Sequence, residues 1–110
     1  MKVVTAYEGS WAHVCLTGRL DGEWAEHLSD ILDEVLRDGL RSVVLDLAEV
    51  DYISSPGTQM LARRYEDFTA LRGELRVASP SPVVQRALTA VGIFDKLILP
   101  PDDTRATRPR

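Results

Sequence analysis

The chain is poor in the residues that disulfides and metal centres require. Cys15 is its only cysteine, so no intrachain disulfide can form, and its place in an apolar strand pattern predicts a buried, inert thiol. The only histidines, His13 and His27, have no second ligand-type residue at metal-binding spacing. We therefore expect no metal site.

Features of nucleic-acid and membrane proteins are also missing. The net charge is −4, and no stretch of basic residues interleaves with aromatics, which argues against a nucleic-acid partner. No apolar run approaches the ~20 residues that span a bilayer, and the N-terminus lacks the apolar core of a signal peptide. We expect a cytoplasmic protein without direct membrane insertion, which can still serve a membrane complex as a soluble subunit.

Motifs for enzymatic chemistry are absent as well. The sequence has no Gly-x-x-x-x-Gly-Lys loop for phosphates and no Gly-x-Ser-x-Gly around its serines, and no histidine is evidently placed as a base. A hydrolase or nucleotide-binding protein that uses Ser55 is thus the least supported hypothesis. We expect a binding module, not an enzyme, with no cofactor of its own.

What the chain does contain is the pattern of a single mixed α/β domain. Its 110 residues, 45% hydrophobic and 27% charged, suffice for one core. A hairpin is predicted around Glu8-Gly9-Ser10, and amphipathic helices then alternate with strands in the order β-β-α-β-α-β-α-β. The expected elements are strands over 2–7 and 11–16, a helix over 23–37, a strand over 42–47, a helix over 56–72, a strand over 74–78, a helix over 82–91 and an edge strand over 97–99. We expect the domain over residues 1–99 and a disordered, polar tail over 100–110.

The junction Asp51–Thr58, between a strand and a helix, is the most informative stretch. Ser55 is predicted to be the N-cap of the helix, and Pro56 its first residue, where no backbone N–H is needed. A helix N-terminus presents free N–H groups and a partial positive charge, so it favours a phosphate on Ser55. Such a phosphate would also change the surface that a partner meets.

Two other loops are expected beside this junction. Crossover connections place the C-terminal ends of parallel strands along one edge of a sheet. The loops Gly18–Asp21, Ser54–Ser55 and Ser79–Pro80 are therefore predicted to be neighbours. Asp21 is a candidate N-cap for the first helix, with partner contact as a second role, and Ser81 is a candidate N-cap for the third.

Three stretches together resemble the STAS domain of bacterial anti-sigma factor antagonists, with a resemblance that runs from about Lys2 to Leu99. They are Thr17–Asp21, then Val43–Leu47 continuing through Tyr52–Gly57, and finally Gly73–Val77 followed by Ser81–Leu88 and Val91–Ile93. Each stretch is loose alone, but the three in this order and spacing are fairly specific.

The resemblance implies partner switching. An antagonist of this family binds an anti-sigma factor, often an ATP-dependent serine kinase, and so frees a sigma factor. The kinase then phosphorylates a serine at the junction, which ends the binding, and a serine phosphatase resets the cycle. The match places the acceptor at Ser55, with Ser54 as the second choice, and pairs Asp21 with the aspartate of the family's neighbouring loop. ATP and magnesium would belong to the kinase.

The resemblance also implies a partner-binding surface on the loops and on the outer face of the following helix. Its expected residues are Asp21, Ser54, Ser55, Pro56, Gly57, Met60, Arg63 and Arg64. A solvated helix face is the alternative interpretation of the last three. Pro56 departs from the Ser, Thr or Ala usual after the acceptor, and Thr58 and Gln59 also depart from the pattern. Pro56 favours the alternative function, which is a non-phosphorylated interaction subunit of a signalling or transporter assembly.

Overall fold

The first two strands form the predicted hairpin. In the computed structural model, which describes residues 2–100 and 103, β1 (Lys2–Glu8) pairs antiparallel with β2 (Trp11–Leu20). Gly9, with a φ of 62°, occupies the first position of the two-residue turn, where a positive φ favours glycine. β2 continues past its expected end, because Gly18 (φ 113°) and local register shifts let the strand bend and reach Leu20.

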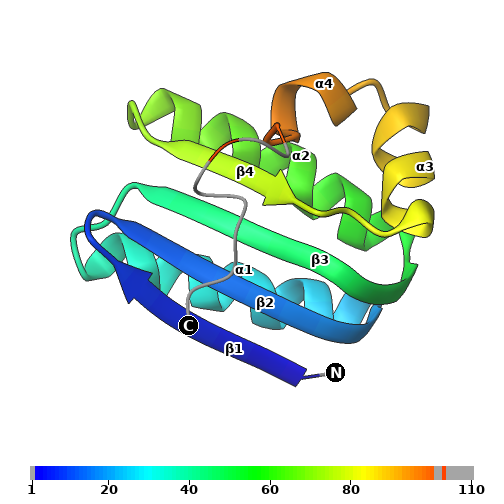
Figure 1. Ribbon diagram of the computed structural model, residues 1–110, viewed down its shortest axis with the longest axis horizontal. Helices are drawn as coiled ribbons and strands as arrows, with labels where there is room; N and C mark the ends of the chain where they lie inside the picture. The colour runs from blue at the N-terminus through cyan, green and yellow to red at the C-terminus, as the bar shows by residue number, and fades with distance from the viewer. Residues whose placement is uncertain (1, 101–102, 104–110) are drawn as a thin grey trace.

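Crossover connections add two parallel strands to the hairpin. β3 (Ser42–Ile53) pairs parallel with both β2 and β4 (Glu74–Ala78), which gives the sheet order β1-β2-β3-β4 (Figure 1). The helices are α1 (Gly22–Arg37), α2 (Ser55–Ala70), α3 (Pro82–Ala90) and α4 (Phe94–Leu97). The mixed α/β fold predicted from the sequence is therefore confirmed.

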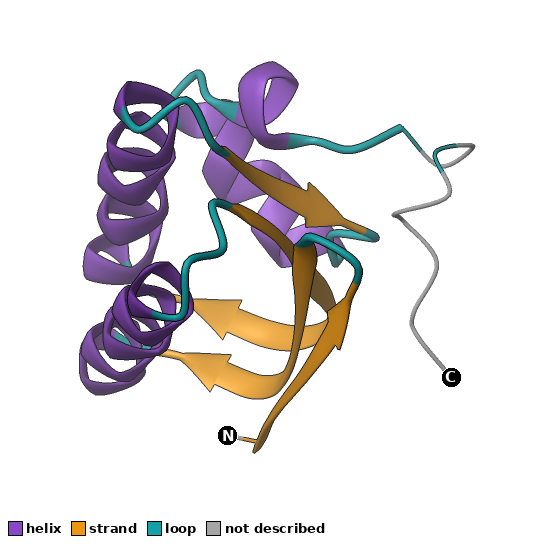
Figure 2. Cartoon of the chain, turned by 90° about the vertical axis from the view of Figure 1, so that its left-hand side faces the viewer, coloured by secondary structure: helices purple, strands orange, loops and turns teal. Residues whose placement is uncertain are grey.

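The main core lies between the sheet and the helices, which gather on one face of the sheet (Figure 2). Each buried apolar side chain in such a core contributes about 1.5–3 kcal/mol relative to exposure. The side chains that are 0% exposed include Leu28 and Leu32 of α1, Val43, Leu45 and Leu47 of β3, and Leu61 and Phe68 of α2. The core thus fixes α1 and α2 against β3, and with them the places where both helices begin.

The opposite face of the sheet carries a smaller cluster. Val44, Ala78 and Leu99 are buried there, and Trp11 packs against them. Cys15 lies on this face, because it pairs with Asp46 while its neighbours along the strand face the helices. Its side chain is only half-buried, so the prediction of a buried thiol is wrong.

The end of the described chain differs from the expected edge strand over 97–99. The chain forms the short helix α4, with the N–H of Leu97 donating to the carbonyl of Ile93 at 3.1 Å. Ile98 then makes an isolated parallel bridge with Val77 of β4. Leu97 turns into the core instead of extending the sheet, because one helical turn buries it completely. Of the expected tail over 100–110, all but residues 100 and 103 lie outside the described residues.

Candidate functional site

The candidate site lies where β2 and β3 end and α1 and α2 begin. The N–H of Ser54 donates to the carbonyl of Leu20 at 2.9 Å, which joins the two loops. Pro56 faces Gly22 so closely that a Cβ on the glycine would lie 3.9 Å from the Cβ of the proline. Two helix N-termini are therefore side by side, and the predicted meeting of the Asp21 and serine loops is confirmed.

The third loop, Ser79–Pro80, contacts β3 near its middle and not at its C-terminal end. The N–H of Ser81 donates to the carbonyl of Leu47 at 3.3 Å, well before the end of β3. This happens because β4 ends opposite Asp46, while β3 continues to Ile53. The expectation that this loop borders the serines is wrong. Ser81 precedes α3, but its buried hydroxyl caps no N–H there.

Ser54, not Ser55, is the N-cap of α2. Its backbone is extended (φ −84°, ψ 167°), and its hydroxyl oxygen accepts the N–H of Gly57 at 3.1 Å. The hydrogen bond from Ser54 to Leu20 holds this residue in the cap conformation, so the helix begins one residue earlier than predicted. Ser55 is the first helical residue and is exposed, and Pro56 is the second.

Few backbone donors are left at the start of α2. Gly57 donates to the Ser54 hydroxyl, Thr58 donates to the Ser54 carbonyl at 2.9 Å, and Pro56 has no N–H. The Ser55 N–H is the one donor of this turn that these bonds leave for an anion. The start of α2 therefore offers a phosphate fewer free N–H groups than predicted. The partial positive charge of the helix dipole remains.

Asp21 is the N-cap of α1, as predicted. One oxygen of its carboxylate accepts the N–H of Trp24 at 3.0 Å, and its carbonyl accepts the N–H of Ala25 at 2.8 Å. The side chain is half-buried. Its structural role leaves the second carboxylate oxygen for a partner.

Gly57 is needed for the close packing of α2 against β2. A Cβ on this glycine would lie 2.9 Å from the carbonyl oxygen of Leu20 and 3.2 Å from Cγ1 of Ile53. Because Gly57 is itself buried, its role is to bring the helix start onto the sheet and not to contact a partner.

The exposed ridge of α2 consists of Ser55, Pro56, Gln59 and Arg63. Met60, by contrast, is 3% exposed and belongs to the core. Arg64 turns toward α1, where it donates to Asp33 at 2.8 Å, and its side chain is 12% exposed. The placement of these last two residues removes them from the surface that the free protein offers, so a contact surface on α2 does not include them.

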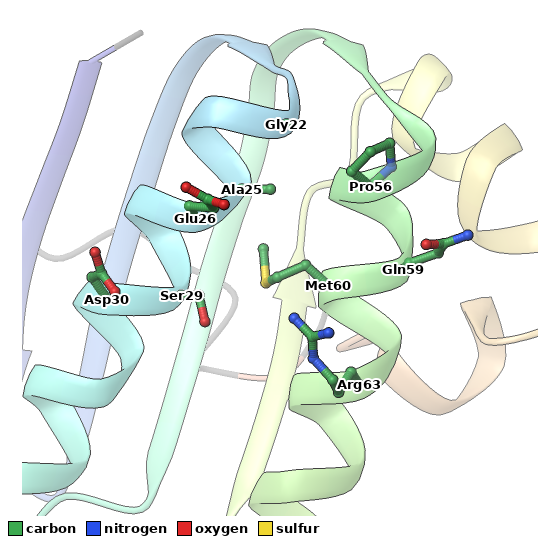
Figure 3. Close-up of a pocket in the computed structure, with 9 residues that line it drawn as sticks. All are labelled: Gly22, Ala25, Glu26, Ser29, Asp30, Pro56, Gln59, Met60 and Arg63. Carbon is green, nitrogen blue, oxygen red and sulfur yellow. The ribbon is translucent and has the colours of Figure 1, made fainter.

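A groove between α1 and α2 borders one side of this ridge (Figure 3). Its volume is about 390 Å³, and Met60 points across it toward α1. The charged residues that line it are Glu26 and Asp30 of α1 and Arg63 of α2. The acidic wall belongs to α1, and the single basic side chain belongs to the ridge.

A second groove, of about 250 Å³, separates the start of α2 from the end of α3. Ser54, Ser55 and Gln59 form one wall, and Ala87, Ala90 and Val91 form the other. Val91, expected on the apolar face of its helix, is 51% exposed. Sequence reasoning missed this wall. The available signal was an apolar residue beside the terminating Gly92, beyond the part of the helix that packs on the sheet.

Both histidines of the chain have partners away from the serine junction. His13 lies with Glu8 at the hairpin, 3.8 Å from its carboxylate, and His27 packs edge-on against Trp24 at 4.8 Å, so neither is placed to activate Ser55. No three His, Cys, Asp or Glu side chains of the described residues gather to hold a metal ion. Across the same residues, no helix combines the length and apolar character that crossing a membrane requires.

Comparison with known proteins identifies the family. Residues 5–107 match the STAS domain family. The chain belongs to this family. The STAS domain is 32% identical over 80 residues to BtrV of Bordetella bronchiseptica, a candidate anti-sigma factor antagonist, with 73% of this chain and 69% of the relative covered. It is also 32% identical over 81 residues to the anti-sigma F factor antagonist of Paenibacillus polymyxa, with 69% of each chain covered.

Solved structures show the same STAS fold. SpoIIAA of Bacillus, an anti-sigma factor antagonist, superposes in its unphosphorylated form with a TM-score of 0.77 over 89% of this chain and 86% of that one. Its phosphorylated form gives a TM-score of 0.73, with 89% of both chains covered. The sequence identity is 15% in both cases, so this likeness concerns the fold alone.

Proposed function

We propose that this STAS domain is an anti-sigma factor antagonist that is switched by phosphorylation of Ser55. The observation that carries the proposal is an exposed hydroxyl on the first residue of α2, next to a serine whose hydroxyl is committed to the cap. Of the two adjacent serines, only Ser55 offers its oxygen without breaking a hydrogen bond described here. The names of the relatives support the antagonist function, and the exposure of Ser55 supports it as the position of the proposed switch.

The contact surface in this proposal is centred on Ser55 and extends into both grooves. Pro56 and Gln59 continue it along α2, and Arg63 adds a positive charge one helical turn further on. Asp21 contributes its free carboxylate oxygen from the neighbouring loop. The mixture of an apolar groove at α3 and a charged groove at α1 suits a protein partner, because interfaces combine an apolar centre with a polar rim.

Phosphorylation would act through charge. Transfer of a phosphoryl group from ATP of a partner kinase to the Ser55 oxygen replaces a neutral hydroxyl by nearly two negative charges. The chain offers one N–H at this position, while Glu26 and Asp30 line the groove beside it. A docked partner would bury this charge without a prepared cation, which costs several kcal/mol. Such a cost turns a micromolar contact into a negligible one without a change in the backbone.

The proposed partner is an anti-sigma factor with serine kinase activity in the cytoplasm. ATP and magnesium would be bound by this kinase, and a serine phosphatase would restore the hydroxyl. The STAS domain itself would act as a binding module and not as an enzyme. The occurrence of SpoIIAA in a phosphorylated and an unphosphorylated form supports such a cycle on this fold.

Mass spectrometry of the protein isolated from its native cells, together with the proteins that it captures, tests this proposal. We expect one phosphate on Ser55, which persists in Ser54→Ala, the matched control, and is lost in Ser55→Ala. We also expect capture of a serine kinase by Ser55→Ala and little capture by Ser55→Asp. A phosphate that persists in Ser55→Ala, or equal capture by both Ser55 variants, would contradict the proposed switch.

A specific observation favours a second candidate, a non-phosphorylated interaction subunit of a signalling or transporter assembly. Pro56 follows the acceptor directly and removes an N–H that would otherwise be available to a phosphate. In this case the ridge of α2 would bind its partner permanently. Capture of the same partner by the wild type and by Ser55→Ala, with no phosphate on either, would support this second function.

A further inference from the structure

Among the described residues, the outer side of β1 is a sheet edge that no other strand covers. Figure 1 shows β1 at one border of the sheet, where it pairs with β2 alone. Edge strands usually avoid association by means of charges, proline or bulges. The centre of β1, Val3–Tyr7, has no charge and no proline, and its register with β2 is continuous. Val4 and Tyr7 are 52% and 55% exposed.

The other border of the sheet is covered by the chain itself. Ile98 forms a parallel bridge with Val77 of β4, and the N–H of Leu99 donates to the Val77 carbonyl at 2.9 Å. The side chain of Arg76 also donates to the carbonyl of Lys96. Within residues 2–100, the chain therefore pairs with itself at the β4 edge and leaves the β1 edge unpaired.

The hairpin turn determines which backbone groups of β1 face outward. Glu8 and Trp11 flank a two-residue turn, so they form a hydrogen-bonded pair across the hairpin. Hydrogen-bonded and non-hydrogen-bonded pairs alternate in an antiparallel ladder. The N–H and carbonyl groups of Val3, Thr5 and Tyr7 consequently point away from β2.

These outward groups match those of a second copy turned antiparallel about Thr5. In this register Thr5 lies opposite Thr5, and Val3 opposite Tyr7, so the outward backbone groups of both strands can bond each other. Lys2 then lies opposite Glu8 at both ends, and the intervening pairs are uncharged. Opposite charges and apolar pairs across strands are both stabilising.

We propose that the chain forms a two-fold symmetric homodimer through antiparallel β1–β1 pairing centred on Thr5. The pairing extends the sheet across both molecules. One strand pair buries less than the roughly 1,200 Å² of a stable interface, so we expect a dissociation constant on the order of micromolar. The interface lies on the border of the sheet away from α2 and α3, and it is independent of the proposed function.

Sedimentation equilibrium of the purified chain tests the dimer. We expect a concentration-dependent monomer–dimer equilibrium for the wild type. Thr5→Pro removes an outward N–H and is expected to be monomeric, whereas the matched control Thr5→Val keeps this N–H and dimerises. A wild type that stays monomeric at about 0.5 mM, far above a micromolar constant, would overturn the proposal.

Charge reversal tests the pairing without disturbing the strand centre. Lys2→Glu and Glu8→Lys each place like charges opposite one another at both ends, and each is expected to weaken the dimer about tenfold. The double variant Lys2→Glu, Glu8→Lys restores opposite charges and is expected to regain most of the affinity. A double variant as weak as the single ones would contradict this register.

Cysteine crosslinking reads the register directly. In a Cys15→Ser background, Thr5→Cys is expected to form a disulfide-linked dimer under mild oxidation, because only residue 5 faces its own copy. Val4→Cys and Ala6→Cys are the controls, since each faces a different residue of the second copy. Faster crosslinking of either control would exclude pairing about Thr5.

Discussion

Two adjacent serines differ in role because of one long-range hydrogen bond. The bond from the Ser54 N–H to Leu20 holds Ser54 at the end of β3, where its hydroxyl reaches back to Gly57. Ser55 enters the helix with its side chain toward solvent. The acceptor proposed here is therefore selected by the fold and not by a difference in chemistry between the two hydroxyls.

Ser54→Ala is expected to lower the free energy of unfolding by about 1 kcal/mol, because it removes the side-chain cap of α2. Ser55→Ala changes an exposed residue without a described partner and is expected to stay within about 0.5 kcal/mol of the wild type. Urea denaturation of both variants measures the two values. Equal losses would show that the cap is not confined to Ser54.

Gly57→Ala is expected to destabilise the protein by about 1–3 kcal/mol, the usual cost of overpacking. The added methyl would meet a backbone oxygen, which cannot move away as a flexible side chain does. Gly22→Ala is the matched control, because its nearest contact is an ordinary 3.9 Å, and we expect no loss of stability there. Thermal unfolding of both variants decides the question, and an equal effect would refute the packing role of Gly57.

The roles of single residues could be predicted from the sequence only in part. Asp21 was identified as a cap because it stands alone before its helix. Ser54 and Ser55 satisfy the same local rule, and the choice between them depends on Leu20, which lies far away in the sequence. The family resemblance predicts Met60 on the partner-binding surface, but the approach of α1 buries it.

Among the elements, α3 ends in an exposed apolar surface that its amphipathic sequence pattern does not reveal. Val84 and Leu88 pack into the core, while Val91 lies beyond it and lines the groove beside Ser55. An exposed apolar residue next to a proposed switch is a candidate anchor for the partner, because anchors of this kind carry most of the binding energy of an interface.

Val91→Glu is expected to weaken capture of the anti-sigma factor at least tenfold, equivalent to about 1.4 kcal/mol, with little change in stability. Thr89→Glu is the matched control, because Thr89 is an exposed residue of α3 that does not line the groove. Binding and thermal unfolding are measured for both. If Thr89→Glu weakens capture as strongly, the effect is one of charge in general and not of this groove.

Hydrophobic periodicity predicted α1, α2 and the hairpin, because each buries a continuous stripe. It failed where tertiary contacts override local pattern. β3 runs to Ile53 because β2 continues beside it, although the apolar run itself ends at Leu47. The segment before Leu99 forms α4 because the helical turn buries Leu97.

For the whole molecule, chain order and crossover geometry were enough to predict the mixed sheet and the meeting of the Asp21 and serine loops. They did not predict that α3 would complete the site, since this depends on β4 ending earlier than β3. The unpaired edge of β1 was equally hidden, because a sequence does not show which border of a sheet a later segment such as Ile98–Leu99 will pair with.

The parallel pairing of Ile98 with Val77 at the edge of β4 also bears on how many molecules could join. A symmetric dimer through β1 would use the unpaired border of both participants, while Ile98 and Leu99 already bond to Val77 at the opposite border. Growth would then end at the dimer, whereas a sheet with two unpaired borders could add subunits indefinitely as a filament. In the proposed dimer, Ile98 and Leu99 would therefore hinder the addition of a further strand at β4, and with it the growth of a fibril.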